Sequence, residues 1–206
     1  MNTKYVDEGF HLLHWATEVE ALCPRCSSVG LIKGNPHYKE WSATFMCTSC
    51  SHSLKTDRDG WHGPVLGIGQ RPCCACGKKW VRVEKTYDDA SAIKTNTENS
   101  RCENCNTLNE VELDLYRSKP LDHSIEPFFG LDLALKEETR HGVVWAYSAS
   151  HLAELKKYIG AQLRESSGTK WSYFTRLPGW LKSAKNREQI LKVISKLESR
   201  VITKQC

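Results

Sequence analysis

Four Cys-x-x-Cys pairs constrain this sequence more than any other feature. The pairs are Cys23-Pro-Arg-Cys26, Cys47-Thr-Ser-Cys50, Cys73-Cys-Ala-Cys76 and Cys102-Glu-Asn-Cys105. Twenty residues separate the first pair from the second, and 25 separate the third from the fourth. Two intervening residues let the chain turn so that both sulfur atoms face one ion, and two such turns complete a tetrahedral shell of four thiolates. The spacing therefore predicts two four-cysteine zinc sites.

The cysteines favour metal binding over the other uses of a thiol. The chain has ten of them in 206 residues, and its first residues lack the basic and apolar regions of a secretory signal, so we expect a cytoplasmic protein without disulfides. Redox pairs of the thioredoxin kind sit in a βαβ pattern, which this sequence does not show. An iron–sulfur cluster is the remaining four-thiolate alternative. A closed shell of four thiolates leaves no open coordination position, so two structural Zn²⁺ ions are predicted.

The remaining cysteines and a nearby histidine are weaker candidates for metal ligands. Cys74 lies inside the third pair and could compete with Cys73 as a ligand, but we interpret it as a bystander thiol. Cys206 is the last residue, and His52 would replace a thiolate only if a quartet were incomplete. Gly77 directly follows the third pair, where the absence of a Cβ suits a left-handed backbone turn.

Composition divides the sequence into three parts. Residues 1–58 are predicted to form a first zinc ribbon with an N-terminal segment, and residues 59–120 a second ribbon. Residues 121–206, which have no further cysteine pair, are predicted to form an α+β C-terminal domain. A stretch of ~30 to 40 residues cannot bury enough apolar surface to fold alone. Zinc binding, worth ~10 to 16 kcal/mol in finger peptides, would stabilise each ribbon.

Within the ribbons, short strand-favouring segments flank the cysteine pairs. They are residues 31–34, 41–46, 80–85 and 110–116. Residues 88–100 are polar and predict a mobile loop, which accounts for the longer second spacing. The predicted fold class is therefore two tandem zinc-stabilised β ribbons followed by an α+β domain.

The C-terminal part has the pattern of a hairpin followed by helices. Alternation over residues 131–136 and the β-favouring run 143–147 predict a β-hairpin. Ser148 or Ser150 can then cap a helix. The apolar face of that helix comprises Leu152, Leu155, Ile159 and Leu163. A second helical region begins at Pro178, so this domain should hold a hairpin and two or three helices.

These features resemble known zinc-binding proteins at two levels. The paired quartets resemble the broad zinc-ribbon family twice over. Three further segments are similar to segments of uncharacterised bacterial zinc-ribbon proteins: residues 126–133, 144–165 and 176–187. With the ribbons, this resemblance covers most of the chain. It implies a compact cytoplasmic protein and brings no catalytic residues to transfer.

The sequence offers little that would support catalysis. It has no phosphate loop, dinucleotide fingerprint or nucleophile elbow. A zinc deaminase would need a His-x-Glu motif, which does not occur, and all four cysteine pairs are already assigned. Asp57, Asp59 and His62 fall in a segment rich in turn-forming residues and are interpreted as polar loop residues. We therefore expect a binding protein without enzymatic activity.

Charge directs the search for a partner to the C-terminal half. The formal net charge is +5, but residues 1–124 hold 15 basic and 16 acidic side chains, whereas residues 125–206 hold 14 and eight. Arg176, Lys182, Lys185 and Arg187 are candidate contacts for an anionic partner. The alternative is that they form the solvated face of an amphipathic helix.

Two kinds of partner are compatible with this sequence, which has no membrane span and no evident small-molecule substrate. Nucleic acid is the first, because basic and aromatic residues are interleaved at 78–82 and at 171–176. A protein is the second, with this chain acting as an adaptor or as an immunity or antitoxin protein that covers an effector. Zinc ribbons serve both purposes, so the predicted fold does not decide between them.

Overall fold

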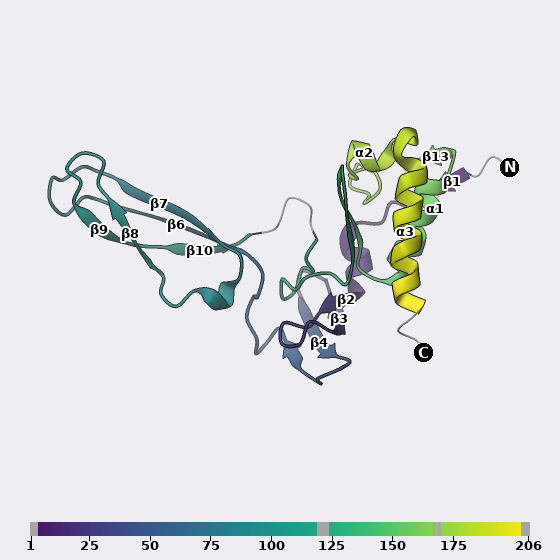
Figure 1. Ribbon diagram of the computed structural model, residues 1–206, viewed down its shortest axis with the longest axis horizontal. Helices are drawn as coiled ribbons and strands as arrows, with labels where there is room; N and C mark the ends of the chain where they lie inside the picture. The colour runs from purple at the N-terminus through teal and green to yellow at the C-terminus, as the bar shows by residue number, and fades with distance from the viewer. Residues whose placement is uncertain (1–3, 119–123, 167, 169, 203–206) are drawn as a thin grey trace. The chain divides into compact units, whose positions relative to one another are not determined.

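The protein, described by a computed structural model over residues 4–118, 124–166, 168 and 170–202, has two compact units. Unit 1 joins Met1–Asp59 with Glu126–Cys206, and unit 2 is Gly60–Ile125 (Figure 1). The sequence-based boundaries define three consecutive parts, whereas here the first ribbon and the C-terminal part share one unit. Unit 2 is therefore an insertion between the two halves of unit 1.

The first ribbon is a four-stranded antiparallel sheet whose strands follow sequence order. They are β2 (Glu18–Leu22), β3 (Val29–Asn35), β4 (Ser42–Cys47) and β5 (Ser53–Lys55). Side chains alternate between the two faces of a strand. One face carries Val19, Ile32 and Phe45, which are fully buried, and the opposite face is largely exposed and polar.

After unit 2, the chain returns to this sheet and covers its apolar face. Leu133 forms an antiparallel bridge with Ala21 of β2, and the N–H of Leu22 donates to the carbonyl of Asp132 at 2.8 Å. Phe129 and Leu133 are fully buried in the same core as the ribbon. The sequence pattern assigns Leu133 to a hairpin, but the structure uses it here because it completes the ribbon's core.

Glu126 fixes the start of this returning segment. Its side chain is fully buried and accepts hydrogen bonds from the N–H groups of Phe128 at 2.6 Å, Phe129 at 2.9 Å and Leu131 at 2.8 Å. Burial raises the pKa of Glu126 to about 7, against the opposing effect of these backbone donors. One carboxylate thus satisfies the backbone of a tight buried turn.

The rest of unit 1 is a hairpin covered by helices. Its elements are the hairpin strands β11 (Leu135–Thr139) and β12 (Gly142–Ala146), α1 (Ala149–Gly160), α2 (Gly179–Lys182), the 3-10 turn η3 (Ala184–Asn186) and α3 (Arg187–Ile202). The short strands β1 (Lys4–Val6) and β13 (Leu163–Glu165) pair in parallel, and the 3-10 helix η1 (Leu12–Thr17) leads into β2. The helical region expected after Pro178 is thus interrupted by η3.

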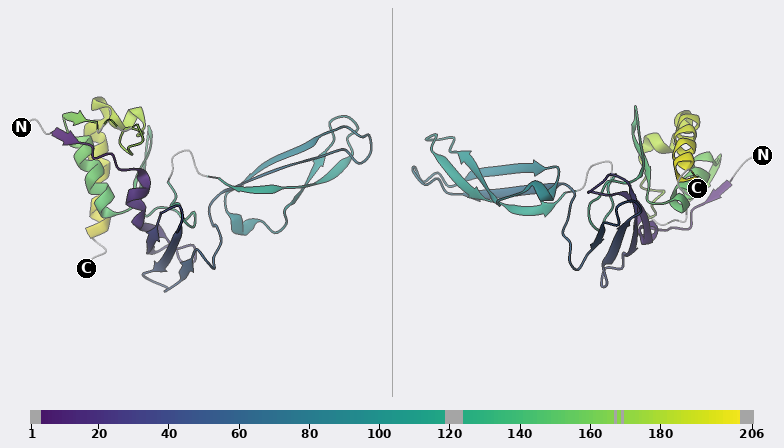
Figure 2. Two further views of the ribbon diagram at one scale, coloured as in Figure 1. Left: turned by 180° about the vertical axis from the view of Figure 1, so that it is seen from behind. Right: turned by 60° about the horizontal axis from the view of Figure 1, so that its bottom comes forward.

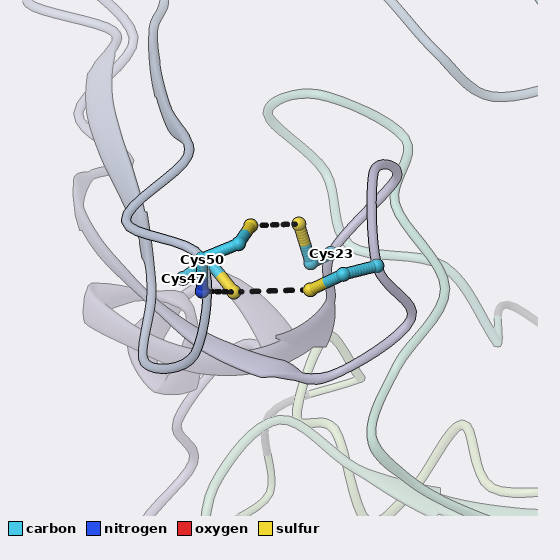
Figure 3. A group of neighbouring side chains, drawn as sticks. Cys23, Cys47 and Cys50 are labelled. Carbon is cyan, nitrogen blue, oxygen red and sulfur yellow. Dashed lines mark hydrogen bonds between the residues drawn. The ribbon is translucent and has the colours of Figure 1, made fainter.

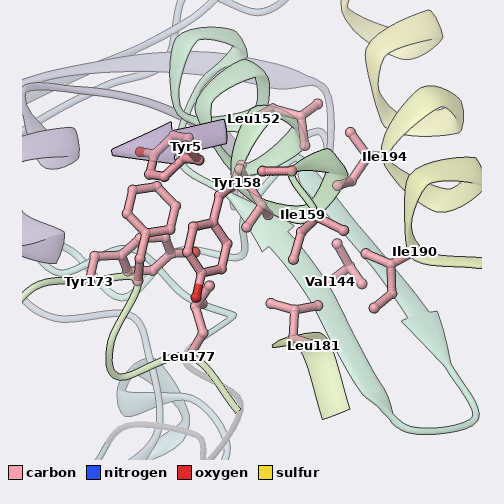
Figure 4. Packing of buried hydrophobic residues seen from close by; sticks show 14 of the residues in the cluster. Tyr5, Val144, Leu152, Tyr158, Ile159, Tyr173, Leu177, Leu181, Ile190 and Ile194 are labelled. Carbon is pink, nitrogen blue, oxygen red and sulfur yellow. The ribbon is translucent and has the colours of Figure 1, made fainter. Parts of the chain in front are cut away.

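The helices of unit 1 enclose an apolar core against the hairpin. Ser148 caps α1 by accepting a hydrogen bond from the N–H of His151. Ile159 of α1, Ile194 of α3 and Val144 of β12 point toward one another in this core (Figure 4). All three side chains are fully buried, so burial of apolar surface stabilises this half of unit 1.

His151 lies among aromatic rings between this core and that of the ribbon. It is fully buried, its Nδ1 accepts a hydrogen bond from the N–H of Tyr147 at 3.1 Å, and its ring stacks on Trp15 with centroids 5.0 Å apart. Tyr173 contacts it edge-on at 4.7 Å. Burial lowers the pKa of His151 to about 3, so the ring is neutral.

Unit 2 is the second ribbon and contains two small antiparallel sheets. One has the order β10 (Asp114–Arg117), β6 (Val65–Arg71) and β7 (Val81–Tyr87), and the other pairs β8 (Thr97–Arg101) with β9 (Leu108–Glu112). A short 3-10 helix, η2 (Ala90–Ala92), precedes β8. Figure 2 shows β6 and β7 running side by side, as their pairing requires.

Two sequence-based expectations for unit 2 need correction. Residues 97–100 belong to β8 and not to a mobile loop, because their backbone pairs with β9 even though the side chains are polar. The single strand expected over residues 110–116 is broken at Leu113, where the chain leaves its pairing with β8 and begins to pair with β6. None of the helices in the described parts of the chain has the length and apolar character that a membrane crossing requires.

Candidate metal centres

The four Cys-x-x-Cys turns share one backbone structure. In each turn the N–H of the first cysteine donates to the carbonyl of the residue five positions later, at 2.8 to 2.9 Å. These bonds are Cys23 to Ser28, Cys47 to His52, Cys73 to Lys78 and Cys102 to Thr107. The bond closes the turn and directs both sulfur atoms to its inner side.

Each turn also ends with a left-handed residue directly after its second cysteine. These residues are Ser27, Ser51, Gly77 and Asn106, with φ between 56° and 68°. The sequence drew attention only to Gly77, because glycine is the residue that enters this region at little cost. The other three positions pass unnoticed in sequence, although asparagine also tolerates a left-handed backbone better than most residues do.

The turns combine in pairs to make two groups of four sulfur atoms. Within each group all sulfur atoms lie within 4.8 Å of one another. In unit 1 the sulfur of Cys23 lies 3.7 Å from that of Cys50, and the sulfur of Cys26 lies 3.6 Å from that of Cys47 (Figure 3). In unit 2 the corresponding distances are 3.5 Å for Cys73 and Cys105, and 3.7 Å for Cys76 and Cys102.

These distances fit a metal ion and exclude a disulfide. Four sulfur atoms in a tetrahedron around zinc, with Zn–S bonds of about 2.3 Å, lie about 3.8 Å apart. A disulfide would require a sulfur–sulfur distance of about 2.05 Å. All eight cysteines are free thiols. Each quartet therefore has the donor set and spacing of a four-thiolate metal site.

The local electrostatics favour the thiolate form at four of the eight cysteines, Cys26, Cys47, Cys73 and Cys76, whereas neighbouring sulfur atoms and burial raise the pKa of Cys50 and Cys102. The N–H groups of Cys76 and Ala75 point at the sulfur of Cys73 and lower its pKa to about 6. In unit 1 hydrogen bonds with Ser28 lower the pKa of Cys26 to about 6. The first cysteine of every pair is buried and the second is exposed, so each site lies at the edge of a core.

The competing candidates lie outside the sulfur groups. Cys73, and not Cys74, joins the second quartet, while the side chain of Cys74 is exposed. His52 contributes its backbone carbonyl to the second turn and is not a member of the quartet in the described structure.

Asn109 is a site residue that the sequence analysis missed. It is 2% exposed, and its Oδ1 accepts from the N–H of Cys74 at 2.9 Å while its Nδ2 donates to the carbonyl of Thr107 at 2.8 Å. Nδ2 also lies 3.8 Å from the Cys73 sulfur. Asn109 therefore joins the third turn to the fourth outside the sulfur shell.

The first site has apolar residues at the positions that correspond to Asn109 and to its hydrogen-bond partner Cys74. Leu54 follows Cys50 by four residues, just as Asn109 follows Cys105, and it is buried. The position that corresponds to Cys74 is Pro24, which has no N–H to satisfy. A signal for Asn109 was thus present in the sequence, but only in the alignment of one ribbon with the other.

The four cationic candidates of the C-terminal half do not form one free helix face. The Lys182 ammonium donates to the carbonyl of Thr175 at 2.9 Å, and the Nε of Arg187 is buried. Arg176 and Lys185 are exposed. The helical interpretation of residues 176–187 is interrupted by η3, so these side chains come from a loop, two short turns and the start of α3.

Two of the interleaved aromatic residues are exposed beside a cation. The guanidinium of Arg176 lies 5.8 Å from the ring centre of Trp171, which is 63% exposed, and the Lys79 ammonium lies 5.3 Å from the ring centre of Trp80. Tyr173 is different, because it is buried in the core of unit 1 and cannot contact a partner.

Comparison with protein-family models, with characterised protein sequences and with solved structures found no match for this chain. The two four-cysteine groups and the small antiparallel sheets that hold them therefore define what is established: a zinc-ribbon-like architecture with two sites able to bind a metal ion.

Proposed function

We propose that this chain is a binding protein without enzymatic activity, in which two structural zinc ions stabilise the ribbons and unit 1 contacts nucleic acid. The observation that carries the metal part is the geometry of the two sulfur quartets. Four thiolates close the coordination shell of zinc and leave no position for a substrate. The resemblance to zinc-ribbon proteins supports the same assignment.

Charge and an exposed ring support the nucleic-acid part. Residues 125–206 hold 14 basic and eight acidic side chains. Trp171 offers a ring on which a base can stack, and Arg176 beside it can meet a phosphate. Lys182 bonds to Thr175, the neighbour of Arg176, which adds a second positive charge nearby.

Metal analysis tests the first part of the proposal. We expect about two zinc atoms per chain by atomic emission in freshly purified protein. One or none would contradict the assignment, and so would stoichiometric iron with the visible absorption of an iron–sulfur cluster.

Fluorescence anisotropy with labelled single-stranded DNA and RNA tests the second part. Binding should weaken as salt rises from about 50 to 200 mM, because phosphate contacts release counterions. The variant Trp171→Ala with Arg176→Glu should bind at least about tenfold more weakly, since one stacked base contributes ~1 to 3 kcal/mol. The control is Lys192→Glu, an exposed residue of α3 paired with Glu188.

Two outcomes would contradict the nucleic-acid part. The first is no binding at the lowest salt concentration. The second is equal binding by the double variant and the wild-type protein. A stoichiometric, nuclease-insensitive complex with another protein would instead support the alternative of an adaptor or an immunity or antitoxin protein.

A further inference from the structure

The exposed face of the first ribbon contains a hollow that none of the features above uses. It is a shallow concavity, open to solvent, with a volume of about 710 Å³. Its lining comes entirely from the first ribbon and the end of η1, between Thr17 and Asp57. It lies on the face of the sheet opposite to the one that residues 126–134 cover.

Strand register places two lysines on either side of a hydroxyl in this hollow. Lys33 of β3 pairs with Thr44 of β4, and Thr44 pairs with Lys55 of β5. Residues paired in this way point to the same face of the sheet. Neighbouring strands lie about 4.8 Å apart, so the two lysine backbones are separated by about 10 Å. Both ammonium groups can therefore reach a ligand above Thr44.

Six lysines in the described part of unit 1 form ion pairs with acidic side chains, and these two do not. Among the described residues, no carboxylate lies within 4.0 Å of the ammonium group of Lys33 or Lys55. Lys136, Lys156 and Lys196, by contrast, all form ion pairs. The charges of Lys33 and Lys55 are thus available to a ligand.

The two acidic residues that line the hollow, Glu18 and Asp57, lie outside the row formed by Lys33, Thr44 and Lys55. Glu18 of β2 pairs with Lys33 and so lies on the far side of that residue from Thr44. Asp57 follows the end of β5. This order leaves a positive centre over Thr44 with negative charge at its margin. Such a centre can hold one anionic group.

We propose that the hollow binds a single phosphate group of a nucleotide, either free or within a strand. Lys33 and Lys55 neutralise the phosphate oxygens, and the Thr44 hydroxyl donates a hydrogen bond to one of them. The Thr56 hydroxyl accepts from the N–H of Ala43 at 3.0 Å, which leaves its own proton free to donate. Glu18 and Asp57 accept hydrogen bonds from the amino groups of a base.

This site goes beyond the proposed function, because it uses none of the residues around Trp171. It would remain if the ligand were a free nucleotide and unit 1 bound no strand. If nucleic acid does bind unit 1, the ribbon offers a second place for its backbone.

Titrations followed by the amide signals of residues 33, 44 and 55 test the proposal. The probes are inorganic phosphate, AMP and a single-stranded oligonucleotide, each added to the full zinc-loaded chain. At least one probe should shift these signals with saturation. Lys33→Gln or Lys55→Gln should weaken binding by about three- to tenfold each, and the double variant by more than tenfold. Lys39→Gln is the control, since Lys39 is an exposed lysine in the turn between β3 and β4.

The outcomes separate this site from the proposed function. Saturation by AMP alone assigns the site to a free nucleotide, and saturation by the oligonucleotide assigns it to a strand. Loss of oligonucleotide binding in the Trp171 and Arg176 variant, with AMP binding kept, leaves the hollow intact as a separate site. The proposal is overturned if no probe shifts these amides, or if the double lysine variant binds every probe as tightly as Lys39→Gln does.

Discussion

The two units use the same metal-binding turn but differ in what else stabilises them. In unit 1 the first quartet borders a core in which ribbon residues such as Phe45 are covered by Phe129 and Leu133 from the returning chain. In unit 2 the buried apolar cluster of the described residues is Cys73, Val81, Cys102 and Val111, with Val65 and Leu113 buried outside it, and two of the four belong to the sulfur quartet. We therefore expect unit 1 to be stabilised mainly by its apolar core, and unit 2 to depend on the metal that its sulfur quartet can bind.

The largest effect should come from removing a ligand of the second site. Cys102→Ser should unfold unit 2, because its small core cannot offset the conformational entropy of the chain without the metal. Amide signals of unit 2 should collapse to random-coil positions while those of α1 and α3 stay dispersed.

Matched variants define the limits of that prediction. Cys47→Ser in unit 1 should disturb the ribbon but leave the core formed by α1 and α3 folded, and Cys74→Ser should change neither unit. If unit 2 stayed folded with Cys102→Ser, the contrast between the units would be wrong.

The second prediction concerns the segment that covers the apolar face of the first ribbon in unit 1. Glu126→Gln should lower the free energy of unfolding of unit 1 by about 2 to 4 kcal/mol, since its amide NH₂ faces backbone donors that need an acceptor. Urea denaturation followed by signals of each unit measures the effect. Glu138→Gln, at an exposed position of β11, serves as the control. Equal losses in both units would show that they are not independent.

The third prediction is a pH dependence that belongs to unit 1. Because the pKa of His151 is depressed to about 3 in the fold, its contribution is present above the unfolded value of about 6.5 and is lost as the pH falls below it. The loss is roughly 1.4 kcal/mol per pH unit. Glu126, whose pKa is raised, acts in the opposite sense: its contribution is present at low pH and is lost as the pH rises toward 7.

Acid also releases zinc, so a variant of His151 is needed to separate the contribution of this histidine to the pH dependence from the effect of zinc release. His151→Phe keeps the thiolates and Glu126 but removes the titration. Its melting temperature should fall less steeply than that of the wild-type protein between pH 6.5 and 5. Parallel slopes would show that His151 does not contribute to the acid sensitivity of unit 1.

The smallest effect should come from Asn109, which hydrogen-bonds to the backbone of the two turns of the second site without being one of the four cysteines. Asn109→Leu should weaken zinc binding in unit 2 by about 10- to 100-fold, because it leaves the N–H of Cys74 without an acceptor. Adding Cys74→Pro copies Pro24 and Leu54 of the first site and should recover much of the loss. Competition with a chromophoric chelator measures both affinities, and an unchanged affinity in the single variant would remove Asn109 from the site.

The sequence predicts the grouping of the cysteines well and the long-range assembly poorly. The two quartets follow from spacing, because a Cys-x-x-Cys turn and its partner are local structures. The return of Leu133 to β2 joins positions 112 residues apart in sequence and leaves no periodic signal. Its alternation with Leu131 fits a hairpin equally well, so the pattern could not reveal which sheet it joins.

Polar side chains explain the errors in unit 2. Residues 97–100 form a strand with a partly exposed polar surface, and their pairing is set by the backbone and the nearby metal turn. Propensity and hydrophobicity do not report such a strand. The hollow with Lys33 and Lys55 escaped notice for a similar reason, since only strand register brings these residues into one row.

Amide hydrogen exchange before and after zinc chelation compares the metal dependence of the two units. Chelation should remove protection throughout β6 to β10 of unit 2, while α1, α3 and the hairpin of β11 and β12 stay protected. Restoring two equivalents of zinc should restore the pattern. Protection in unit 2 that persists without metal, or equal loss in both units, would contradict the claim that the metal replaces a core in one unit and supplements it in the other.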